Sequence, residues 1–394
     1  MNRLFPLVLL FLIACTLRIG WPSSLPDNPA PTELPLADTA SPASITSIDP
    51  PPHPISLPTG FAISVYAEGL DDPRMLAIGP DGQLYVAERG AGRLLRLPDR
   101  DGDGLLDQVE VAAEGLNNPS SLDFYQDGSL YVGETEKVWR LSEMDSTGRF
   151  QERQVVVEGL PPGHHSTRTV LFSPDFKQLF VSVGSSCNVC AEEDERRAAI
   201  LLCNPDGSGE RIYARGLRNA VGITFRPGTD ELWATNNGRD LMGDDLPPET
   251  IYVVKDGAYY GWPYCHAGRI LDPDFGGPDA CQEIEQPVVE IPAHSAPLGL
   301  EFYTGEAFPE EYHGDLFVAL HGSWNRSAPV GYKVVRIPID GDAPGPVEDF
   351  AIGWLRGLSS WGRPVDLATA PDGSLFLSDD AGGRIYRIFY VGEK

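Results

Sequence analysis

The stretch DLATAPDGSLFLSDDAGGRIYRI, from Asp366 to Ile388, decides the fold of this 394-residue chain. A short apolar run leads into a Pro-Asp-Gly turn, an alternating run from Ser374 to Ser378, a turn at Ala381 to Gly383 and a last run from Arg384 to Ile388. Alternation with a period of two, interrupted by turn residues, is typical of β-strands joined by tight hairpins. The stretch therefore predicts three antiparallel strands.

Five more copies of this unit occur along the chain. The clearest are LAIGPDGQLYVAERGAGRLLRL, starting at Leu76, and LDFYQDGSLYVGETEKVWRL, starting at Leu122. Others start at Val170, Gly222 and Leu300, and the last is the weakest. A repeat of roughly 40 to 50 residues with three or four strands is typical of a β-propeller, in which each blade covers its neighbour. We therefore predict an all-β fold, a six-bladed β-propeller of four-stranded antiparallel blades, rather than an ordinary β-sandwich.

The first residues predict export. Arg3 precedes an apolar run from Leu4 to Ile13 that is too short to span a bilayer, as in a secretion signal. The sequence Leu-Ile-Ala-Cys ending at Cys15 resembles the bacterial lipobox, which implies cleavage after residue 14, lipidation of Cys15 and attachment to the cell envelope by a lipid anchor only. A plain signal peptide with an incidental cysteine is the alternative.

Residues 15–57 are rich in Pro, Ser, Ala and Thr without periodicity, which predicts an extended tether ahead of a propeller at 58–392. We expect the first strand, Phe61 to Tyr66, to complete the last blade and close the ring. The net charge of −27 argues against nucleic acid as a partner, because binding to a phosphate backbone needs clustered cations.

The segment DRDGDGLLDQVE, Asp99 to Glu110, matches the calcium-loop pattern D-x-D-x-D-G-x5-E. We expect it to bind Ca²⁺ in a structural role, in a loop between blades. The alternative is a solvated acidic turn. The candidate ligands are Asp99, Asp101, Asp103, Asp107 and Glu110.

The remaining cysteines predict disulfides, the default in an exported protein. Cys187 and Cys190 form a C-x-x-C sequence without the second pair of a zinc site, and Cys265 and Cys281 flank a loop. Cys203, in an apolar run, reads as a buried thiol. The sequence leaves the pairing open.

Polar residues gather in four stretches just before or after alternating runs, where blade patterning does not require them. Strand ends of a propeller converge on the axis, so a histidine, arginines and carboxylates there would suit acid-base work on a polar ligand. Hydrogen bonds and salt bridges between blades are the alternative. The stretches are Gly163 to Thr169, Gly216 to Asn219, Asn237 to Asp240 with Asp244 and Asp245, and Arg363 to Asp366 with Asp379 and Asp380.

The ordered motifs GHHSTRTVLFSPD, ARGLRNAVGITF, LWATNNGRD, YYGWPYC and RPVDLATAPDGSLFLSDDAGG resemble the glucose/sorbosone dehydrogenase family over Leu57 to Tyr390. The resemblance implies a six-bladed propeller that holds pyrroloquinoline quinone (PQQ) and Ca²⁺ at the axial mouth. It also implies oxidation of an aldose or sorbosone-like sugar, with electrons passing to an external acceptor. A non-catalytic propeller that binds a ligand or a protein, and a calcium-dependent lactonase-type hydrolase, are the alternative functions.

The resemblance also implies roles for individual residues. His165 fits the sorbosone-type motif of the catalytic base, and His164 fits the glucose-dehydrogenase spacing. Arg218 and Asn219 match the family's Arg-Asn pair at the quinone. The backbone carbonyls of Gly238 and Arg239 match the position that holds the calcium ion of the cofactor.

Four further positions match cofactor-site residues of the family: Arg363, Asp379, Tyr260 and Trp262. The sequence also departs from the family. A second arginine is replaced by Val365, and the lysine that pairs with the quinone has no match, so His321 or Arg326 would stand in for it.

Overall fold

The computed structural model describes residues 49–341 and 343–392. The predicted signal segment, Cys15 and most of the predicted tether lie outside these described residues. Within the described ranges, the secondary structure is almost entirely β, with one 3-10 helix, η1 (Glu310–Tyr312). No helix of the described residues is long and apolar enough to cross a membrane.

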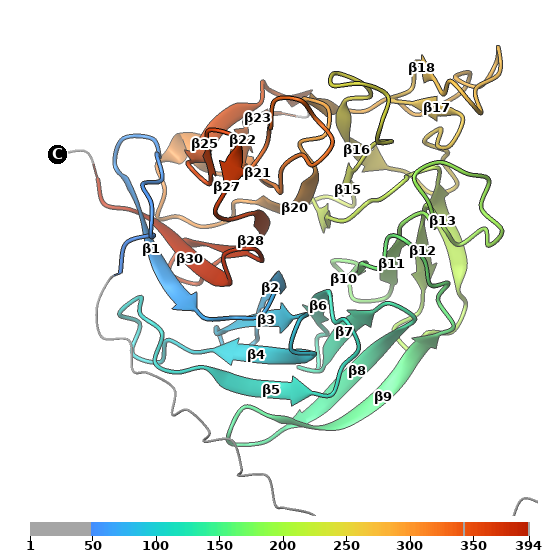
Figure 1. Cartoon of the computed structure of the whole chain (residues 1–394). Helices are drawn as coiled ribbons and strands as arrows, with labels where there is room; N and C mark the ends of the chain where they lie inside the picture. The colour runs from blue at the N-terminus through green and yellow to red at the C-terminus, as the bar shows by residue number, and fades with distance from the viewer. Residues whose placement is uncertain (1–48, 342, 393–394) are drawn as a thin grey trace, which may run out of the picture. The chain divides into compact units, whose positions relative to one another are not determined.

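Six four-stranded antiparallel sheets follow one another around a ring (Figure 1), which confirms the predicted six-bladed propeller. In each sheet the first strand of the blade is innermost. The first three blades consist of β2 (Pro73–Ile78), β3 (Leu84–Glu88), β4 (Arg93–Leu97) and β5 (Glu110–Glu114); β6 (Ser121–Phe124), β7 (Leu130–Glu134), β8 (Lys137–Met144) and β9 (Phe150–Glu158); and β10 (Arg168–Phe172), β11 (Leu179–Val183), β12 (Ala199–Cys203) and β13 (Arg211–Arg215).

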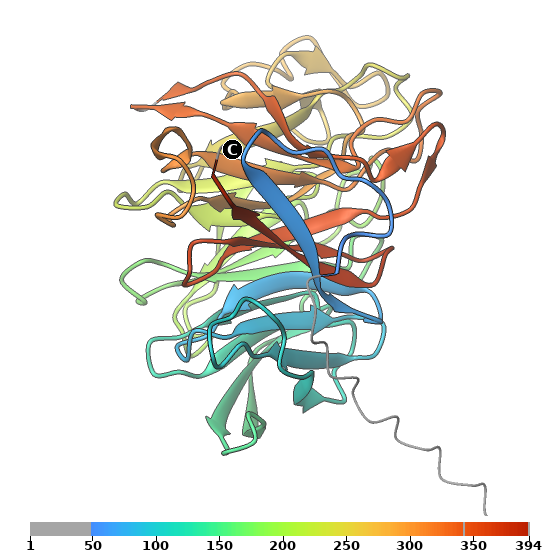
Figure 2. The same cartoon turned by 90° about the vertical axis from the view of Figure 1, so that its left-hand side faces the viewer.

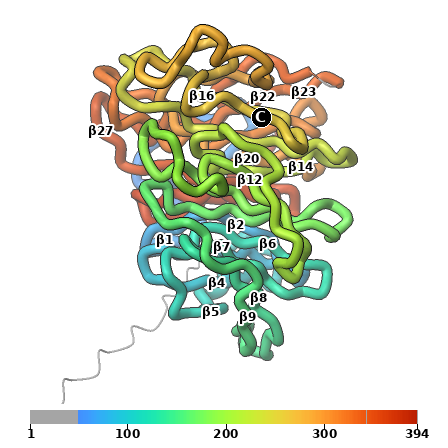
Figure 3. The backbone as a smooth tube through the Cα atoms, turned by 90° about the vertical axis from the view of Figure 1, so that its right-hand side faces the viewer, coloured from blue at the N-terminus to red at the C-terminus, as the bar shows by residue number. Residues whose placement is uncertain are grey.

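In the second blade, β8 and β9 form a long hairpin at the edge of the propeller (Figure 3). The fourth and fifth blades carry insertions. These two blades consist of β14 (Ile223–Phe225), β15 (Leu232–Asn236), β16 (Glu249–Val254) and β19 (Val289–Ile291); and β20 (Pro297–Phe302), β21 (Leu316–Leu320), β22 (Lys333–Ile337) and β25 (Glu348–Ile352). Small two-stranded ribbons are β17 (Cys265–His266) with β18 (Ile270–Leu271), β23 (Ile339–Asp340) with β24 (Ala343–Pro344), and β26 (Leu355–Arg356) with β27 (Ser359–Ser360).

The first strand closes the ring, as predicted. β1 (Phe61–Glu68) pairs antiparallel with β30 (Arg384–Tyr390), followed inward by β29 (Leu375–Asp379) and β28 (Pro364–Thr369). Figure 2 shows β1, in blue, beside the dark-red end of the chain. The two ends of the described chain are thereby joined through main-chain hydrogen bonds in one blade.

The last part of the predicted tether is attached to the propeller. Ser56 and Ile352 exchange two backbone hydrogen bonds of 2.7 and 3.0 Å, and the amide of Val65 donates to the carbonyl of Asp49 at 2.7 Å. Residues 49–57 therefore belong with the fifth and sixth blades, and the predicted boundary at residue 57 between tether and propeller is too late in the sequence.

Apolar side chains of the described residues form one cluster at each of the six interfaces between adjacent blades. Alternation along β3 shows how this arises. Tyr85 packs toward the second blade, whereas Leu84 and Val86 pack toward the sixth. Because successive side chains of a strand point to opposite faces, a strand that is apolar at every position is buried on both sides.

The Asp-Gly turns hold the hairpins between the first and second strands of three blades. Gly82, Gly128 and Gly373 have φ of 74°, 83° and 80°, a conformation that glycine adopts without strain. The preceding aspartate accepts the amide two residues on, for example Ser374 N–H to Asp372 Oδ1 at 2.9 Å. These turns lie on the face of the propeller opposite the candidate site described below.

Candidate active site at the ends of the inner strands

Topology gathers the predicted polar stretches on one face. Neighbouring strands of a blade run antiparallel, so the loops before the first strand and after the second strand of every blade lie on the same face. Of the predicted residues, His165 and Arg218 precede β10 and β14, and Arg363 precedes β28. Gly238 follows β15. We call this face the mouth face.

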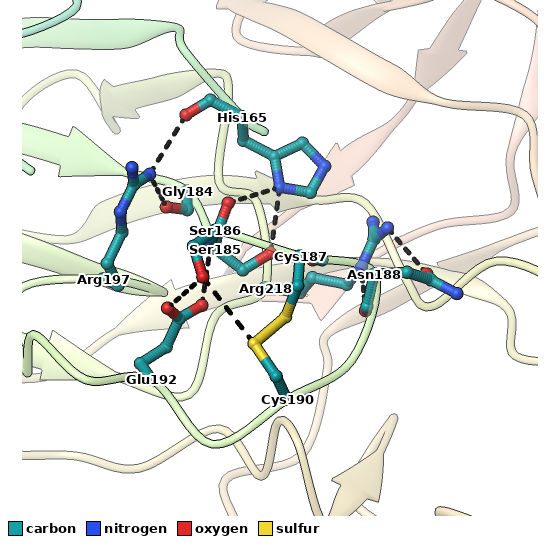
Figure 4. The surroundings of a disulfide bond; sticks show 10 residues. All are labelled: His165, Gly184, Ser185, Ser186, Cys187, Asn188, Cys190, Glu192, Arg197 and Arg218. Atoms are coloured by element: carbon teal, nitrogen blue, oxygen red, sulfur yellow. Dashed lines mark hydrogen bonds between the residues drawn. A yellow bond between two sulfur atoms is a disulfide. The ribbon is translucent and has the colours of Figure 1, made fainter. Parts of the chain in front are cut away.

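His165 is held in a defined orientation. Its Nδ1 lies 3.0 Å from the carbonyl oxygen of Ser185 and 2.9 Å from the Ser185 hydroxyl, which itself donates to the carbonyl of Cys187 at 2.7 Å. A carbonyl only accepts, so Nδ1 carries the proton and the lone pair is on Nε2. No described residue hydrogen-bonds to that Nε2 (Figure 4). Burial, with Arg218 nearby, lowers the pKa of His165 to about 3, so its ring is neutral at neutral pH.

His164 occupies a different environment. It is exposed, and its ring meets that of His165 edge to face at 4.8 Å between centroids. No hydrogen bond to the His164 ring is found among the described residues, whereas His165 has two partners on Nδ1. This geometry favours His165 over His164 as the base.

Arg218 is buried beside His165. Its Nε and one terminal nitrogen donate to the carbonyl and side-chain oxygens of Asn188, each at 2.9 Å. The same terminal nitrogen donates to Asp240 at 2.8 Å, and the other lies 3.3 Å from the carbonyl of Asn237. The carbonyl of Arg218 accepts the amide of Ser185 at 2.8 Å, which links this side chain to the loop that orients His165.

Asn219, the other member of the predicted pair, lies with His165 over the same side of Gly184. A Cβ placed on Gly184 would come 2.4 Å from Asn219 Oδ1 and 2.6 Å from His165 Cβ. Only glycine therefore allows these two side chains to approach so closely.

A second cluster crosses the mouth face from the first blade to the fifth. Asp380 accepts Arg74 at 2.6 Å and His321 Nε2 at 2.9 Å. Burial raises the pKa of Asp380, but its contacts with His321 and Arg74 outweigh this effect and hold the pKa below its usual range. Burial lowers the pKa of His321 to about 4. The three side chains come from β2, the end of β21 and the end of β29.

The Arg363 side chain contacts this cluster, and the Arg363 backbone is bonded to Asp379. Arg363 donates through Nε to the carbonyl of His321 at 3.0 Å and through a terminal nitrogen to that of Gly322 at 2.8 Å. Asp379 is fully buried and accepts the amides of Arg363 and Gly382, each at 2.7 Å. Its oxygens are thus occupied within its own blade.

The Asn237 to Asp240 loop brings main-chain oxygens to the mouth face. The Gly238 amide donates to Glu249 at 2.6 Å, and burial raises the pKa of Glu249 to about 7. The carbonyls of Gly238 and Arg239 accept no hydrogen bond from the described residues. The Arg239 side chain turns outward to the insertion, where it pairs with Asp272 and Asp274.

Two predicted cofactor residues lie beside the outermost strand of the third blade. Tyr260 donates from its hydroxyl to the carbonyl of Val253 at 3.1 Å and packs in the interface of the third and fourth blades. The preceding residue, Tyr259, bridges to Arg215 on β13, the outermost strand of the third blade. Trp262 follows along the same outer edge, where its amide donates to the carbonyl of Gly216 at 3.1 Å.

The predicted calcium loop connects β4 and β5 within the first blade, rather than two blades, and lies on the opposite face from the mouth. Side-chain oxygens of Asp99, Asp101 and Asp103 lie within 4.8 Å of one another. Asp107 and Glu110 are turned to arginines instead: Arg100 lies 3.3 Å from Asp107 and is also paired with Glu110. The loop therefore groups three of the five predicted ligands.

A cavity of about 290 Å³ lies along the axis, lined by the innermost strands of all six blades. Asp123, Glu301 and Asp366 line it, and each accepts the amide of an inner strand in the next blade. Burial raises the pKa of each of these three carboxyls to about 7.

The disulfides Cys187–Cys190 and Cys265–Cys281 are both formed, and Cys203 is free and buried, as predicted. Asn188 and Arg74 are parts of the site that the sequence analysis did not single out, whereas Asp380 belongs to one of the four polar stretches that it named. Arg74 is a charged residue near the start of β2, the innermost strand of the first blade, and that position is a signal that could have found it. Asn188 gives no such signal.

The fold and the mouth face define a class: a six-bladed β-propeller whose inner-strand ends gather a histidine, arginines and free main-chain carbonyls. The sequence model of the TrAA12-like family matches residues 55–273 and 277–390. The chain belongs to the TrAA12-like family.

Curated relatives extend beyond this chain. An uncharacterized protein of Borreliella burgdorferi is 39% identical over 232 residues, which cover 57% of this chain and 61% of that protein. A pyrroloquinoline quinone-dependent pyranose dehydrogenase of Coprinopsis cinerea is 27% identical over 407 residues, covering 86% of this chain and 55% of its own length. The chain thus spans less than two thirds of the length of each.

Solved structures share the fold. The PQQ domain of the Coprinopsis cinerea pyranose dehydrogenase, in its holo form, matches with a TM-score of 0.74 at 24% identity, covering 86% of this chain and 98% of that one. The PQQ-bound aldose sugar dehydrogenase of Streptomyces coelicolor matches with a TM-score of 0.63 at 22% identity, covering 85% and 99%. At these identities the likeness establishes the architecture alone.

Proposed function

We propose that this protein is a PQQ- and calcium-dependent dehydrogenase that oxidises an aldose or sorbosone-like sugar and passes electrons to an external acceptor. The observation that carries the proposal is the neutral imidazole of His165. Its Nε2 is the unprotonated nitrogen, has no partner among the described residues, and lies near the buried cation Arg218. The relatives named as pyranose and aldose sugar dehydrogenases support the reaction class.

The residues of the mouth face fit a quinone that carries three carboxylates. An arginine has five N–H donors. Arg363 uses two of them in its bonds to main-chain carbonyls and stands over the ring of Tyr332 at 5.6 Å. Its remaining donors have no partner among the described residues. Arg74 and Arg326 are already paired with Asp380 and Asp245, so Arg363 is the candidate partner for a carboxylate of the quinone. Bidentate guanidinium–carboxylate pairs are among the strongest polar contacts in proteins.

Calcium has a candidate place at the carbonyls of Gly238 and Arg239. Hard cations take oxygen ligands, and these two carbonyl oxygens are not used by any described donor. The Asp99, Asp101 and Asp103 group on the opposite face is the second candidate calcium site, for a structural ion.

In the proposed reaction, His165 accepts the proton of the sugar hydroxyl at Nε2. Ser185 keeps Nδ1 protonated, so a single nitrogen faces the substrate. The guanidinium of Arg218 stabilises negative charge that develops next to the reacting carbon. The bound quinone supplies the acceptor for the hydride. The lowered pKa leaves His165 unprotonated at neutral pH, so the lone pair of Nε2 is free to accept a proton.

We also propose export and lipidation at Cys15, which the sequence predicts and which concern residues outside the described ranges. They would place the enzyme on the outer side of the cytoplasmic membrane, held by the predicted anchor, where sugars and separate electron acceptors are accessible. No charge pattern of the chain favours nucleic acid as a partner.

The test is reconstitution. Purified apoprotein is loaded with PQQ and Ca²⁺, and reduction of an artificial dye is followed with a panel of aldoses and a sorbosone-type sugar. We expect turnover that requires both PQQ and Ca²⁺ and that is lost in His165→Ala. Absence of turnover with every sugar, in protein shown to have bound the quinone, would refute the proposed reaction.

A further inference from the structure

The segment from Ser185 to Cys190 contacts the side chains of both His165 and Arg218. Figure 4 shows His165 on one side of this loop and Arg218 on the other. Ser185, just before the loop, orients the His165 ring through its carbonyl and hydroxyl oxygens. The hydroxyl of Ser185 donates in turn to the carbonyl of Cys187. One short segment thus sets the position of the base and of the cation.

Asn188 makes the contacts to Arg218, and every polar group of its side chain is used. Its Oδ1 accepts from Arg218 at 2.9 Å and from the Asp240 amide at 2.8 Å, and its Nδ2 donates to the Asp240 carbonyl at 3.0 Å. Its own carbonyl accepts Arg218 Nε at 2.9 Å. Partners that only donate face Oδ1 and one that only accepts faces Nδ2, so the orientation of the amide is fixed.

The disulfide closes the turn that presents Asn188. Cys187 and Cys190 are bonded three residues apart, and both are half-buried, so a small reductant can reach them. Besides the covalent bond and the contacts of Asn188 and Ser185 given above, Ser186 holds this turn by donating to Glu192 through its amide at 2.7 Å and its hydroxyl at 2.6 Å. Without the S–S bond, the backbone between the two cysteines becomes more mobile. Because Asn188 lies in this segment and accepts two hydrogen bonds from Arg218, the Arg218 side chain would also become more mobile.

We propose that Asn188 is a positioning residue for Arg218, and that the Cys187–Cys190 disulfide makes this positioning depend on the oxidation state of the pair. Two electrons and two protons from a dithiol convert the disulfide to two thiols, and the dithiol becomes a disulfide. The reduced loop holds Arg218 less firmly. This inference rests on the proposed function only for the consequence on catalysis.

The first experiment compares Asn188→Ala and Asn188→Asp with the control Asn204→Ala, an exposed asparagine outside the mouth face. Rates are expressed per bound quinone, so that loss of folded protein does not count. We expect kcat of Asn188→Ala to fall about 10- to 100-fold with the KM for sugar nearly unchanged, because only orientation is lost. Asn188→Asp keeps the acceptor for Arg218 and restores most of the rate. Equal kcat in Asn188→Ala and wild type would overturn the positioning role.

The second experiment isolates the disulfide. The Cys265→Ser/Cys281→Ser variant retains only the loop disulfide, and Cys187→Ser/Cys190→Ser retains only the remote one. With dithiothreitol, we expect wild type and the first variant to lose about 10-fold in kcat and to recover on reoxidation. The second variant starts low and is insensitive to dithiothreitol. A wild-type rate in that variant would overturn the proposal.

A measurement on apoprotein separates this inference from the proposed function. Amide hydrogen exchange is followed in residues 185–190 and 237–241, with and without dithiothreitol, in the Cys265→Ser/Cys281→Ser variant. We expect faster exchange in both segments after reduction, whether or not any sugar is oxidised. Unchanged exchange in both segments would contradict the proposed role of the disulfide in positioning Arg218, even if the enzyme is active. Expected exchange in a wild-type protein that oxidises no sugar would refute only the proposed dehydrogenase activity.

Discussion

At the scale of single residues, the candidate site depends on which atoms are left unpaired. Ser185 occupies Nδ1 of His165, so Nε2 alone is available to a ligand. Asp379 is the opposite case, because two amides of its own blade bond to its Oδ1 and the Tyr386 hydroxyl donates to its Oδ2. Asp380 next to it binds Arg74 and His321. Two adjacent aspartates therefore have different roles, because their side chains point in different directions.

His165 and His164 can be separated by substitution. We expect His165→Ala to lower kcat by about 100- to 10,000-fold, the usual contribution of a general base, and His164→Ala to lower it less than about 5-fold. Dye-reduction kinetics on quinone-loaded protein measure both. A larger loss in His164→Ala than in His165→Ala would assign the base to the other ring.

Arg363 is expected to hold the cofactor. Replacing Arg363 by Ala removes unpaired donors at the mouth face and should weaken PQQ binding by about 10- to 100-fold. The matched control is Arg140→Ala, which removes a surface pair with Asp127 at 2.7 Å. Fluorescence titration of apoprotein with PQQ gives both affinities. Equal affinities in the two variants would remove Arg363 from the cofactor site.

At the scale of elements, β1 is the piece that closes the ring. Phe61 on this strand meets Phe308, Phe350 and Tyr390 edge to face with centroids 4.7 to 5.2 Å apart, which joins the fifth and sixth blades. The seam therefore consists of a β-ladder and an aromatic cluster, and both depend on a strand that is distant in sequence from its partners.

Removing the aromatic contact should loosen the seam. We expect Phe61→Ala to lower the free energy of unfolding by about 2–4 kcal/mol, somewhat less than for a fully buried Phe because the side chain is half-buried. Phe389→Ala, on a partly buried ring of β30 outside that cluster, is the control. Urea unfolding followed by circular dichroism measures both, and an equal small effect would show that the aromatic cluster does not secure the closure.

The sequence predicts these elements well because alternation and Asp-Gly turns are local. It predicts His165, Arg218 and Arg363 through motifs at strand ends. It cannot identify Asn188, whose partners Arg218 and Asp240 lie 30 and 52 residues away, or the pairing of Arg74 with Asp380 across 306 residues. It also does not show that Tyr260 and Trp262 lie beside β13, because the bridge from Tyr259 to Arg215 joins segments that are distant in sequence.

At the scale of the whole molecule, six interfaces between blades share one axis. Asp366 lies at this axis and its Oδ2 accepts the amide of Leu76 in the first blade at 2.8 Å. In the second blade, the hydroxyl oxygen of Ser121 accepts the amide of Val170 in the third blade, so a hydrogen bond between blades does not require a carboxyl group. The acid at position 366 therefore adds a pH dependence that a hydroxyl would not.

The sign of that dependence follows from burial, which raises the pKa of Asp366 to about 7 in the folded state, above its value of roughly 3.9 in the unfolded chain. Its contribution to stability is complete below about pH 4 and is lost as the pH rises through about 7. We expect Asp366→Asn to gain stability relative to wild type from pH 5 to pH 7, by at most about 1.4 kcal/mol per pH unit.

Urea unfolding at pH 5, 6 and 7 measures this difference, with the exposed Asp230→Asn as control. Asparagine keeps an oxygen for the Leu76 amide, so packing is preserved. A stability difference between Asp366→Asn and wild type that does not change with pH would show that the axial carboxyl stays ionised in the folded protein.

The most direct test of the central claim is a single turnover without any electron acceptor. Apoprotein is loaded with PQQ and Ca²⁺, freed of excess quinone, and mixed anaerobically with an aldose while the absorbance of the bound quinone is recorded. We predict that the sugar converts one oxidised quinone per chain to its reduced form, and that His165→Ala with the same bound quinone does so far more slowly. An oxidised spectrum that persists in the wild-type protein with every sugar would contradict the account.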